Sequence, residues 1–566
     1  MFIRKKSLSG GKVAFQICEN YRDLGRVKQR VLRHVGTAET KDKEALTKML
    51  ETSAFLQREL EQAREKETLA QAPNIPFVQP DAQEPVLPPI MPENHPPDEP
   101  LDEIKENWVD TNKLVEESRV VEGIHAVFGT VLDKFGLQSL LGARHYDVLR
   151  HLMMARIAWP SSKLRASDNL LKRFNTDISE DRMYRLMDAI EGHETSIQKI
   201  VFNAFRPLIG EKVEVLFFDV TTLYFESMEE DDLRRYGFSK DQKTHLTQVV
   251  LALATTQDGL PVGYKLFPGN TAETTTLLQA ISEWRSSLDI GQITIVADRA
   301  MMNEKNLRLL EESGLKYVIA AKLKLLPKEM QNMILKRAEE RVLVHDKEDD
   351  GISVQEHAYN DRRLIVSYST KRARKDARDR EQILVKLGKK IGRNGSTKKL
   401  VTNRGYLSVV TESGNSKVRI DEAKVAAAAK WDGLHGVITN IADARQEEVL
   451  GLYRRLWMIE ESFRINKHTL EMRPVYHYVS RRIRAHILLC YLGFALCRYA
   501  QKRIGMQCET YSVDRIRSIL IEVQYSVLRH EDIGSKYHLP SKMSPEARQI
   551  YGVFGLKRVR RMTKVV

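Results

Sequence analysis

Cysteine is scarce in this 566-residue chain, which contains only Cys18, Cys490, Cys497 and Cys508. Their spacing matches neither the paired ligands of a zinc site nor a disulfide framework, so both classes of protein are excluded. Cys490 and Cys497 fall in an apolar stretch, and we expect them to be packed thiols. This use of cysteine is typical of a reducing cytosol.

Long hydrophobic runs are also missing. The first residues, MFIRKKSLSGGKVAF, contain no apolar signal core. The longest apolar run, residues 487–497, is too short to span a bilayer. We therefore expect a cytoplasmic protein with no membrane partner.

Acidic residues are outnumbered by basic ones, with 76 Asp and Glu against 90 Lys and Arg and a formal net charge of +14. An excess of this sign favours a polyanionic partner, nucleic acid before membrane. A basic protein without such a partner remains the alternative.

Proline marks the first division of the chain. Ten prolines fall between residues 73 and 100, a density that excludes helix and central strand and predicts an extended linker over 71–103. Residues 1–70 then form a separate module. It should contain a β-hairpin around Gly10 and Gly11, and a charged helical stretch from residue 40.

Residues 104–206 have helical periodicity and carry many cations, which predicts a helical DNA-binding domain. A helical scaffold with a solvated basic face fits this segment equally well. Residues 207–325 change in character and should form three antiparallel strands followed by strand–helix–strand. The expected strands are 213–226, 246–256, 260–267, 292–297 and 316–321, with helices at 274–287 and 303–313.

The remainder divides into three parts. Residues 326–430 alternate strand-like pieces around a basic run, 371–400, with twelve Lys or Arg and three Asp or Glu, and we expect a β-rich basic insertion. Residues 431–505 should return to the core with a strand at 433–440 and two helices. Residues 506–566 form a basic C-terminal region. The predicted fold class is α/β, a mixed sheet flanked by helices.

The segment 451–473 lacks Gly and Pro from Leu452 to Met472 and is expected to be one helix. Tyr453, Glu460 and Lys467 are seven residues apart, so they share one stripe of that helix, with Trp457 and Arg464 between them. An apolar face adjoins the stripe: Leu452, Leu456, Ile459 and Phe463. Taken alone, this is equally a surface helix with Glu460 and Arg464 as an ordinary ion pair.

Two further carboxylates, Asp219 and Asp298, each follow a run of buried-strand residues. Side chains at strand ends gather at the rim of an α/β sheet, and the helix that carries Glu460 should pack on that sheet. Three carboxylates meeting there would suit Mg²⁺ or Mn²⁺, and two such ions can cleave a phosphodiester. Each aspartate singly is as easily a turn cap. Glu461 is the rival acid, but helical phase places it off the Tyr–Lys stripe.

Four segments together resemble a known family. FFDVTTLYFES, GLPVGYKLFPGNTAETTTL, VADRAMMNEKNL and YRRLWMIEESFRINK resemble the DDE transposases of the IS4 superfamily, and most closely its IS1634-like branch. The resemblance implies a ribonuclease-H-like core, interrupted by a β-rich insertion before the catalytic Glu. It also implies that Asp219, Asp298 and Glu460 are the catalytic, metal-binding triad and that they bind two ions.

The family's helix signature is matched by Tyr453, Glu460 and Lys467, but Leu456 occupies the position of its Arg. Arg464 is our candidate to replace that cation. By the same resemblance Trp431 could stack on a flipped base, although a core or loop tryptophan is the alternative. Phosphate contacts are also expected from Tyr453, from Lys467 and from the basic run 371–400, which begins with Lys371, Arg372, Arg374 and Lys375.

The function implied is that of a cut-and-paste transposase that binds terminal inverted repeats and target DNA. A freed 3′-OH would attack the opposite strand, through a hairpin as in relatives, and then the target. Such a protein would act as a homodimer on DNA, in the cytoplasm of a bacterium, at the nucleoid when bound. A ribonuclease-H-like nuclease without strand transfer, or a DNA-binding regulator with an inactive site, are the alternatives.

Overall fold

The computed structural model describes residues 2–8, 12–23, 26–39, 109–209, 214–225, 229–237, 246–288, 293–339, 352–393, 405–412 and 415–565. The chain divides into two compact units, Met1–Asn107 and Trp108–Val566. The first contains β1 (Phe2–Leu8), β2 (Lys12–Asp23) and β3 (Arg26–Glu39) in an antiparallel sheet. β1 and β2 pair as the two arms of the predicted hairpin, whereas Gly10 and Gly11 themselves lie outside the described residues. The predicted linker and charged helix lie outside the described residues.

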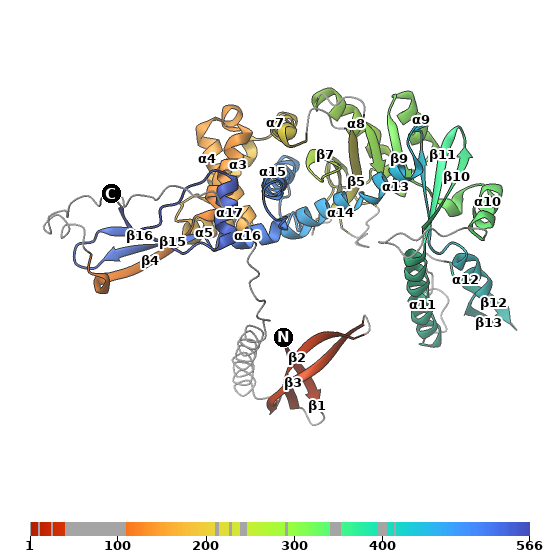
Figure 1. Ribbon diagram of the computed structural model, residues 1–566, viewed down its shortest axis with the longest axis horizontal. Helices are drawn as coiled ribbons and strands as arrows, with labels where there is room; N and C mark the ends of the chain where they lie inside the picture. Colours follow the sequence, from red (N-terminus) through yellow and green to blue (C-terminus); the bar gives the residue numbers. More distant parts are fainter. Residues whose placement is uncertain are drawn as a thin grey trace, which may run out of the picture. The chain divides into compact units, whose positions relative to one another are not determined.

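The second unit is built on a mixed sheet, which has eight strands among the described residues, in the order β10-β11-β14-β9-β8-β5-β6-β7 (Figure 1). The five expected core strands are present: β5 (Val215–Tyr224), β6 (Gln248–Thr256), β7 (Pro261–Pro268), β8 (Thr294–Ala297) and β9 (Lys316–Ala320). β5, β6 and β7 are antiparallel, whereas β8 and β9 run parallel to β5. The prediction of an α/β mixed sheet is confirmed.

Alternate residues of the core strands point into two different apolar layers, because successive side chains of a strand face opposite ways. Phe218 and Ala297 pack in a layer with α8 (Glu273–Leu288) and α9 (Glu304–Glu312). Phe217 and Val296 pack in the other layer, with α14 (Trp457–Arg464) and α15 (Ser480–Gly505). Helices thus flank both faces, which explains why these strands are almost continuously hydrophobic.

The prediction of a β-rich insertion over 326–430 is wrong. After α10 (Lys328–Glu339), β10 (Ile352–Tyr359) and β11 (Arg362–Ser369) join the central sheet, where β11 pairs with β14 (Leu434–Thr439). The part outside the sheet is largely helical. It consists of α11 (Thr370–Arg393), a hairpin of β12 (Leu407–Glu412) and β13 (Asn415–Ile420), and α12 (Glu422–Ala429).

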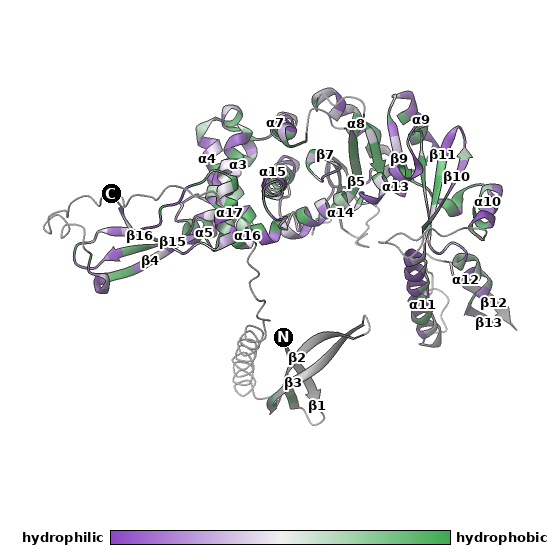
Figure 2. Ribbon diagram, viewed as in Figure 1, coloured by the Kyte–Doolittle hydropathy of each residue, from purple (hydrophilic) through white to green (hydrophobic). Residues whose placement is uncertain are grey.

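The start of the basic run forms α11 rather than strands because it contains no Pro and is rich in Lys, Arg and Leu, which favour helix. Its two glycines, Gly388 and Gly392, fall only in its last two turns. Hydrophilic residues predominate along α11 (Figure 2). The expected strand at 341–345 lies outside the described residues.

The helical segment contains α3 (Gly123–Phe135), α4 (Gln138–Ala158), α5 (Lys163–Phe174), α6 (Glu180–Ala189) and α7 (Glu194–Ile209). It is not wholly helical, because β4 (Leu114–Val121) pairs with a strand from the C-terminal region. That region supplies α16 (Val513–Ile521), β15 (Gln524–His530), β16 (Lys536–Pro540), α17 (Pro545–Val553) and β17 (Thr563–Val565). The two predicted domains, 104–206 and 506–566, are therefore joined by the sheet β17-β16-β15-β4.

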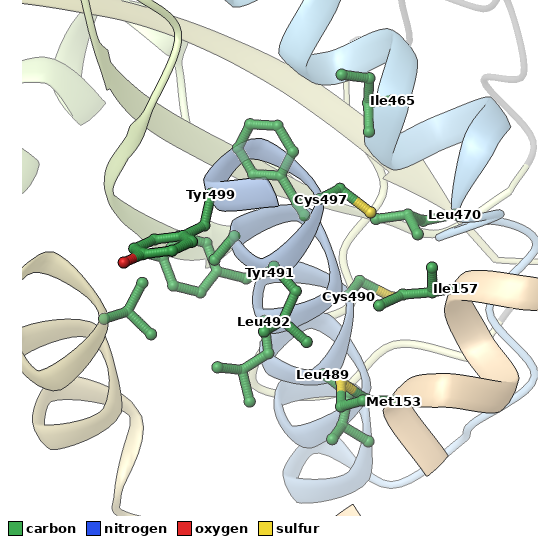
Figure 3. Packing of buried hydrophobic residues seen from close by; sticks show 14 of the residues in the cluster. Met153, Ile157, Ile465, Leu470, Leu489, Cys490, Tyr491, Leu492, Cys497 and Tyr499 are labelled. Carbon is green, nitrogen blue, oxygen red and sulfur yellow. The ribbon is translucent and has the colours of Figure 1, made fainter. Parts of the chain in front are cut away.

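The apolar helix α15 joins the helical segment to the central sheet, since it packs on α3, α4, α6, α7 and β7. Figure 3 shows Cys490 and Cys497 on it, among Met153, Ile157 and Leu470. Both thiols are free and buried. Within the described part of the chain, α15 alone is long and apolar enough to cross a membrane, but 94% of its most apolar window is buried inside the protein. It is the core helix of this unit.

Candidate active site

Strand register brings Asp219 and Asp298 together. β5 and β8 are parallel neighbours, and Phe218 pairs with Ala297. The residue that follows each of these two is an aspartate, Asp219 and Asp298. Paired residues of parallel strands point to the same face. The sequence predicted that Asp219 ends its strand, but β5 continues to Tyr224. The rim is formed by β8 instead, which stops at Ala297 and leaves Asp219 beside its end.

Backbone amides help to orient both carboxylates. Asp219 Oδ1 accepts a hydrogen bond of 2.7 Å from the amide of Val220. Asp298 Oδ1 accepts one of 2.7 Å from the amide of Arg299 and caps the short 3₁₀ turn Arg299–Met301. Asp298 is thus also a turn cap, and its cap hydrogen bond restricts the orientation of its carboxylate.

The expected single helix over 451–473 is three pieces. α13 (Gln446–Arg454) ends in a tight turn and α14 begins at Trp457. The turn makes i,i+3 hydrogen bonds such as Leu456 N to Tyr453 O, 3.0 Å. A π-helical turn, Ile465–Thr469, then follows α14. The tight turn before α14 and the π-helical turn after it each change the rotation per residue. Residues seven apart, such as Tyr453, Glu460 and Lys467, therefore do not share one strict stripe. The buried side chain of Leu456 lies at the first break.

α14 nevertheless packs on the face of the sheet that carries the aspartates. Ile459 and Phe463 are buried in the apolar layer that contains Phe217, and α14 contacts β5. Glu460 is exposed. Glu461 points into a different environment, where its carboxylate lies 3.4 Å from Arg464 and 3.7 Å from Arg498.

Lys467 reaches the same face. Its Nζ donates a hydrogen bond to Thr221 Oγ1, and Thr221 is two residues beyond Asp219, hence on the same side of β5. The Nζ also lies 5.7 Å from the ring centre of Phe463. The structure therefore places the predicted Lys467 next to the strand that carries Asp219.

Tyr453 interacts with Asp298, Glu460 and His435. Burial raises the pKa of its hydroxyl well above the usual range, and the negative charges of Asp298 and Glu460 raise it further. Its ring lies 4.8 Å from that of His435. Burial, with the charge of Arg372, lowers the pKa of His435 to about 4, so His435 is neutral at pH 7.

A cavity of about 550 Å³ opens beside Asp298. Its lining includes three groups named from the sequence, Tyr453, Arg372 and Trp431, the last of which is half-buried. Sequence reasoning missed Lys322 and His435, which also line it. Lys322 comes shortly after β9, as Asp298 comes directly after β8, and this position next to a strand end could have identified it.

Several predicted residues are not brought to this place. Arg464 is exposed and its guanidinium faces Glu461 at 3.4 Å. Lys371, Arg374 and Lys375 are exposed on α11 and do not line the cavity. Among the described residues, no group of three or more His, Cys, Asp and Glu is close enough to hold a metal ion. The carboxylates of Asp219 and Asp298, carried by neighbouring strands, are hard oxygen donors of the kind that Mg²⁺ or Mn²⁺ prefers.

Comparisons with known proteins identify the family. The family described as "Transposase DDE domain" matches residues 211–495, half of the chain. The chain belongs to the DDE transposases. Residues 2–67 match "IS1634 family transposase, N-terminal domain", so the branch is IS1634-like and the protein is the transposase of an insertion sequence, an enzyme that acts on DNA.

Two other comparisons add little. A search of curated protein sequences found no match to the transposase. Among solved structures, it is similar to a piggyBac transposase in a synaptic complex with hairpin DNA, studied by cryo-EM. The two share 10% identity and a TM-score of 0.37, over 70% of this chain and 76% of the other. A likeness this distant carries no argument about mechanism.

Proposed function

We propose that the transposase excises its element by cut-and-paste cleavage of the terminal inverted repeats and joins the freed ends to target DNA. Its core would be ribonuclease-H-like, because three antiparallel strands are followed by two strands parallel to the first. The observation that carries the proposal is the β5–β8 register, which sets Asp219 and Asp298 side by side beneath the helix that bears Glu460.

Asp219, Asp298 and Glu460 would be the metal-binding triad. The two aspartates are held by rigid strands and by their own amide hydrogen bonds, which suits groups that must keep a fixed spacing. Two divalent ions bound there, Mg²⁺ or Mn²⁺, would supply the Lewis acid that activates a water or a 3′-hydroxyl and stabilises the leaving oxygen. Glu460 is proposed over Glu461 because Glu461 already faces Arg464 and Arg498.

The surrounding groups would bind the DNA strand. Lys467 lies on the face of β5 that carries Asp219, where an ammonium would attract a phosphate next to the scissile bond. Arg372, Lys322 and Trp431 line the adjoining cavity with Tyr453, so a phosphate or an unstacked base entering it would meet cations and aromatic rings. The exposed Lys371, Arg374 and Lys375 would extend this basic surface along α11. Arg464, paired with Glu461, supports no phosphate role.

The partners proposed are the two terminal inverted repeats, the target DNA and a second copy of the chain. Joining requires both ends of the element to be held together, which favours a homodimer on DNA. Whether the second strand is cut through a hairpin is the finest part of the proposal and rests on the family alone.

The test uses a supercoiled plasmid that carries the element with its own ends. Purified protein and Mg²⁺ should release 3′-OH ends and then joined products, and EDTA should abolish both. Asp219→Asn and Asp298→Asn should each lose release while keeping the far-UV circular dichroism of the parent. Cleavage without joined products would reduce the activity to that of a nuclease, and unchanged cleavage by both variants would refute the triad.

A further inference from the structure

A second basic cavity lies in the C-terminal region, away from the residues of the candidate active site. It has a volume of about 720 Å³ and is bounded by the end of β16, by α17 and by the segment that follows α17. We call it the C-terminal cradle. Five cations line it: Lys542, Arg548, Lys557, Arg558 and Arg560. Of the described residues that line it, none is acidic.

Four of these cations are available to a ligand. Lys542, Arg548, Lys557 and Arg560 are exposed, and none forms an ion pair with any residue that the structure describes. Nearby cations of the same region differ, since Arg529 and Lys536 both pair with Glu117, at 2.7 and 2.8 Å. Unneutralised like charges around one cavity repel each other, so an anion bound there would relieve the repulsion.

The fifth cation fixes the shape of the cradle. The side chain of Arg558 is only 6% exposed, and its guanidinium donates to Glu122 at 2.7 Å, to the carbonyl of Ser541 at 2.6 Å and to the carbonyl of Gln524. These bonds tie the segment after α17 to β15 and to the end of β16. Tyr551, which also lines the cavity, has a buried hydroxyl without a hydrogen-bond partner among the described residues.

We propose that the C-terminal cradle binds the phosphate backbone of double-stranded DNA. The inference rests on the proposed function, since it assigns a second contact surface to the same substrate. Phosphodiester oxygens are the anions that a row of Lys and Arg without acids recognises, independently of base sequence. The basic character continues along the chain, because residues 542–564 hold seven Lys or Arg and one acid, Glu546. That acid is already paired with Arg515 at 3.0 Å.

The first experiment measures duplex binding by fluorescence anisotropy over a range of salt concentrations. Lys542→Gln with Arg560→Gln should weaken binding and make the slope of log affinity against log salt shallower by about 2, since each phosphate contact contributes about 0.9. The matched control is Arg529→Gln with Lys536→Gln, two cations of the same region that share the carboxylate of Glu117. Because neither of them lines the cradle, the control should leave the slope within experimental error of the parent's.

The second experiment uses Gly552, which is exposed on α17 and lines the cradle. A Cβ added there meets nothing within 4 Å. Gly552→Glu and Gly552→Gln have nearly the same size and differ in charge, so any effect on folding should be shared. We expect the Glu variant to bind duplex DNA about tenfold more weakly than the Gln variant, whether or not the duplex carries an element end.

The outcomes separate the cradle from the proposed function. If the parent binds and cuts its element ends while both cradle variants match it in affinity and slope, the cradle assignment is wrong and the proposed function stands. Loss of slope in the cradle variants supports the cradle even if the parent fails to join DNA. Unchanged DNA affinity together with an altered sedimentation coefficient would assign the surface to a second copy of the chain and overturn the proposal.

Discussion

Glu460 and Glu461 are adjacent in sequence, yet their surroundings differ. Glu461 faces two guanidinium groups. Glu460 is exposed, and its negative charge helps to raise the pKa of Tyr453. A carboxylate already paired with two arginines is a poor candidate for a metal ligand, because the ion would have to displace them. On these surroundings we propose Glu460 rather than Glu461 as the metal ligand, because helical phase does not decide between them once α14 is a separate helix.

We predict that Glu460→Gln lowers the rate of strand cleavage about a thousandfold, with no loss of thermal stability. Glu461→Gln should keep cleavage within severalfold of the parent's and lower the melting temperature, because it leaves Arg498 with a weaker partner. Cleavage rates on the element plasmid and melting curves check both statements. The reverse pattern, with Glu461→Gln inactive and Glu460→Gln active, would exchange the two assignments.

Lys163 is buried, and no carboxylate pairs with it among the residues that the structure describes. Its Nζ lies 3.4 Å from His477 Nε2 and 3.3 Å from His486 Nδ1. Burial, reinforced by the charge of Arg156, lowers its pKa from 10.5 to about 7. Burial likewise lowers the pKa of His477 to about 3 and that of His486 well below its usual value. Both imidazoles are therefore neutral at pH 7.

A lysine whose pKa is depressed by folding destabilises the protein below pH 7, and the penalty disappears as pH rises toward 10.5. Between these values the unfolded chain binds more protons, so stability rises by up to about 1.4 kcal/mol per pH unit. We predict this rise in the parent relative to Lys163→Met, in urea unfolding at pH 7, 8 and 9. Lys172→Met on the same helix, at an exposed site, is the control. Parallel pH profiles of the parent and Lys163→Met would contradict the prediction.

At the scale of elements, the local patterns were predicted and the long-range pairings were not. β5 to β9, with α8 and α9, follow from runs of apolar, β-branched and aromatic residues, from helical periodicity and from turn residues within each segment. The pairing of β11 with β14 and of β4 with β15 joins strands that are distant in the chain. No short pattern encodes such a pairing. The break between α13 and α14 was also missed, because residues 451–473 contain no helix-breaking residue at that point.

Arg362 is one of the groups that fix these long-range contacts. It lies at the start of β11, is buried, and makes ion pairs with Glu304 and Glu311 of α9 at 2.8 and 2.7 Å. Tyr317 of β9 donates to Glu311 at 2.6 Å. The hydrogen bonds from Arg362 hold the pKa values of both carboxylates below their usual range.

We predict that Arg362→Met destabilises the transposase by about 2–3 kcal/mol, less than a fully buried pair would, because both carboxylates are partly exposed. The loss should be present above the ordinary carboxyl pKa and should vanish as pH falls through the depressed values. Arg308→Met removes an exposed partner of the same Glu304 and should cost at most about 0.5 kcal/mol. Urea unfolding at pH 7 and at pH 3 to 4 tests this; equal costs for the two variants would show that the network contributes no more than a surface pair.

At the scale of the whole molecule, the structure divides into fewer compact units than the domains expected from sequence. Residues from Trp108 onward form one compact unit. The helical segment, the core sheet and the C-terminal region share a continuous apolar cluster, and α15 contacts all three. Composition indicated a boundary in the proline-rich segment, because a lack of apolar periodicity can be recognised within a short stretch of sequence. It could not show that segments with their own periodicity pack against one another.

The remaining boundary leads to a prediction for a truncated chain. Residues 1–107 form a separate unit, and the two family matches, 2–67 and 211–495, fall on opposite sides of the division. Because domains with their own cores fold independently, residues 108–566 should unfold cooperatively, with a melting temperature within about 3 °C of the full chain's second transition. Differential scanning calorimetry of both chains measures this. Aggregation or a broad, non-cooperative transition of the fragment would mean that the first unit completes the core of the second.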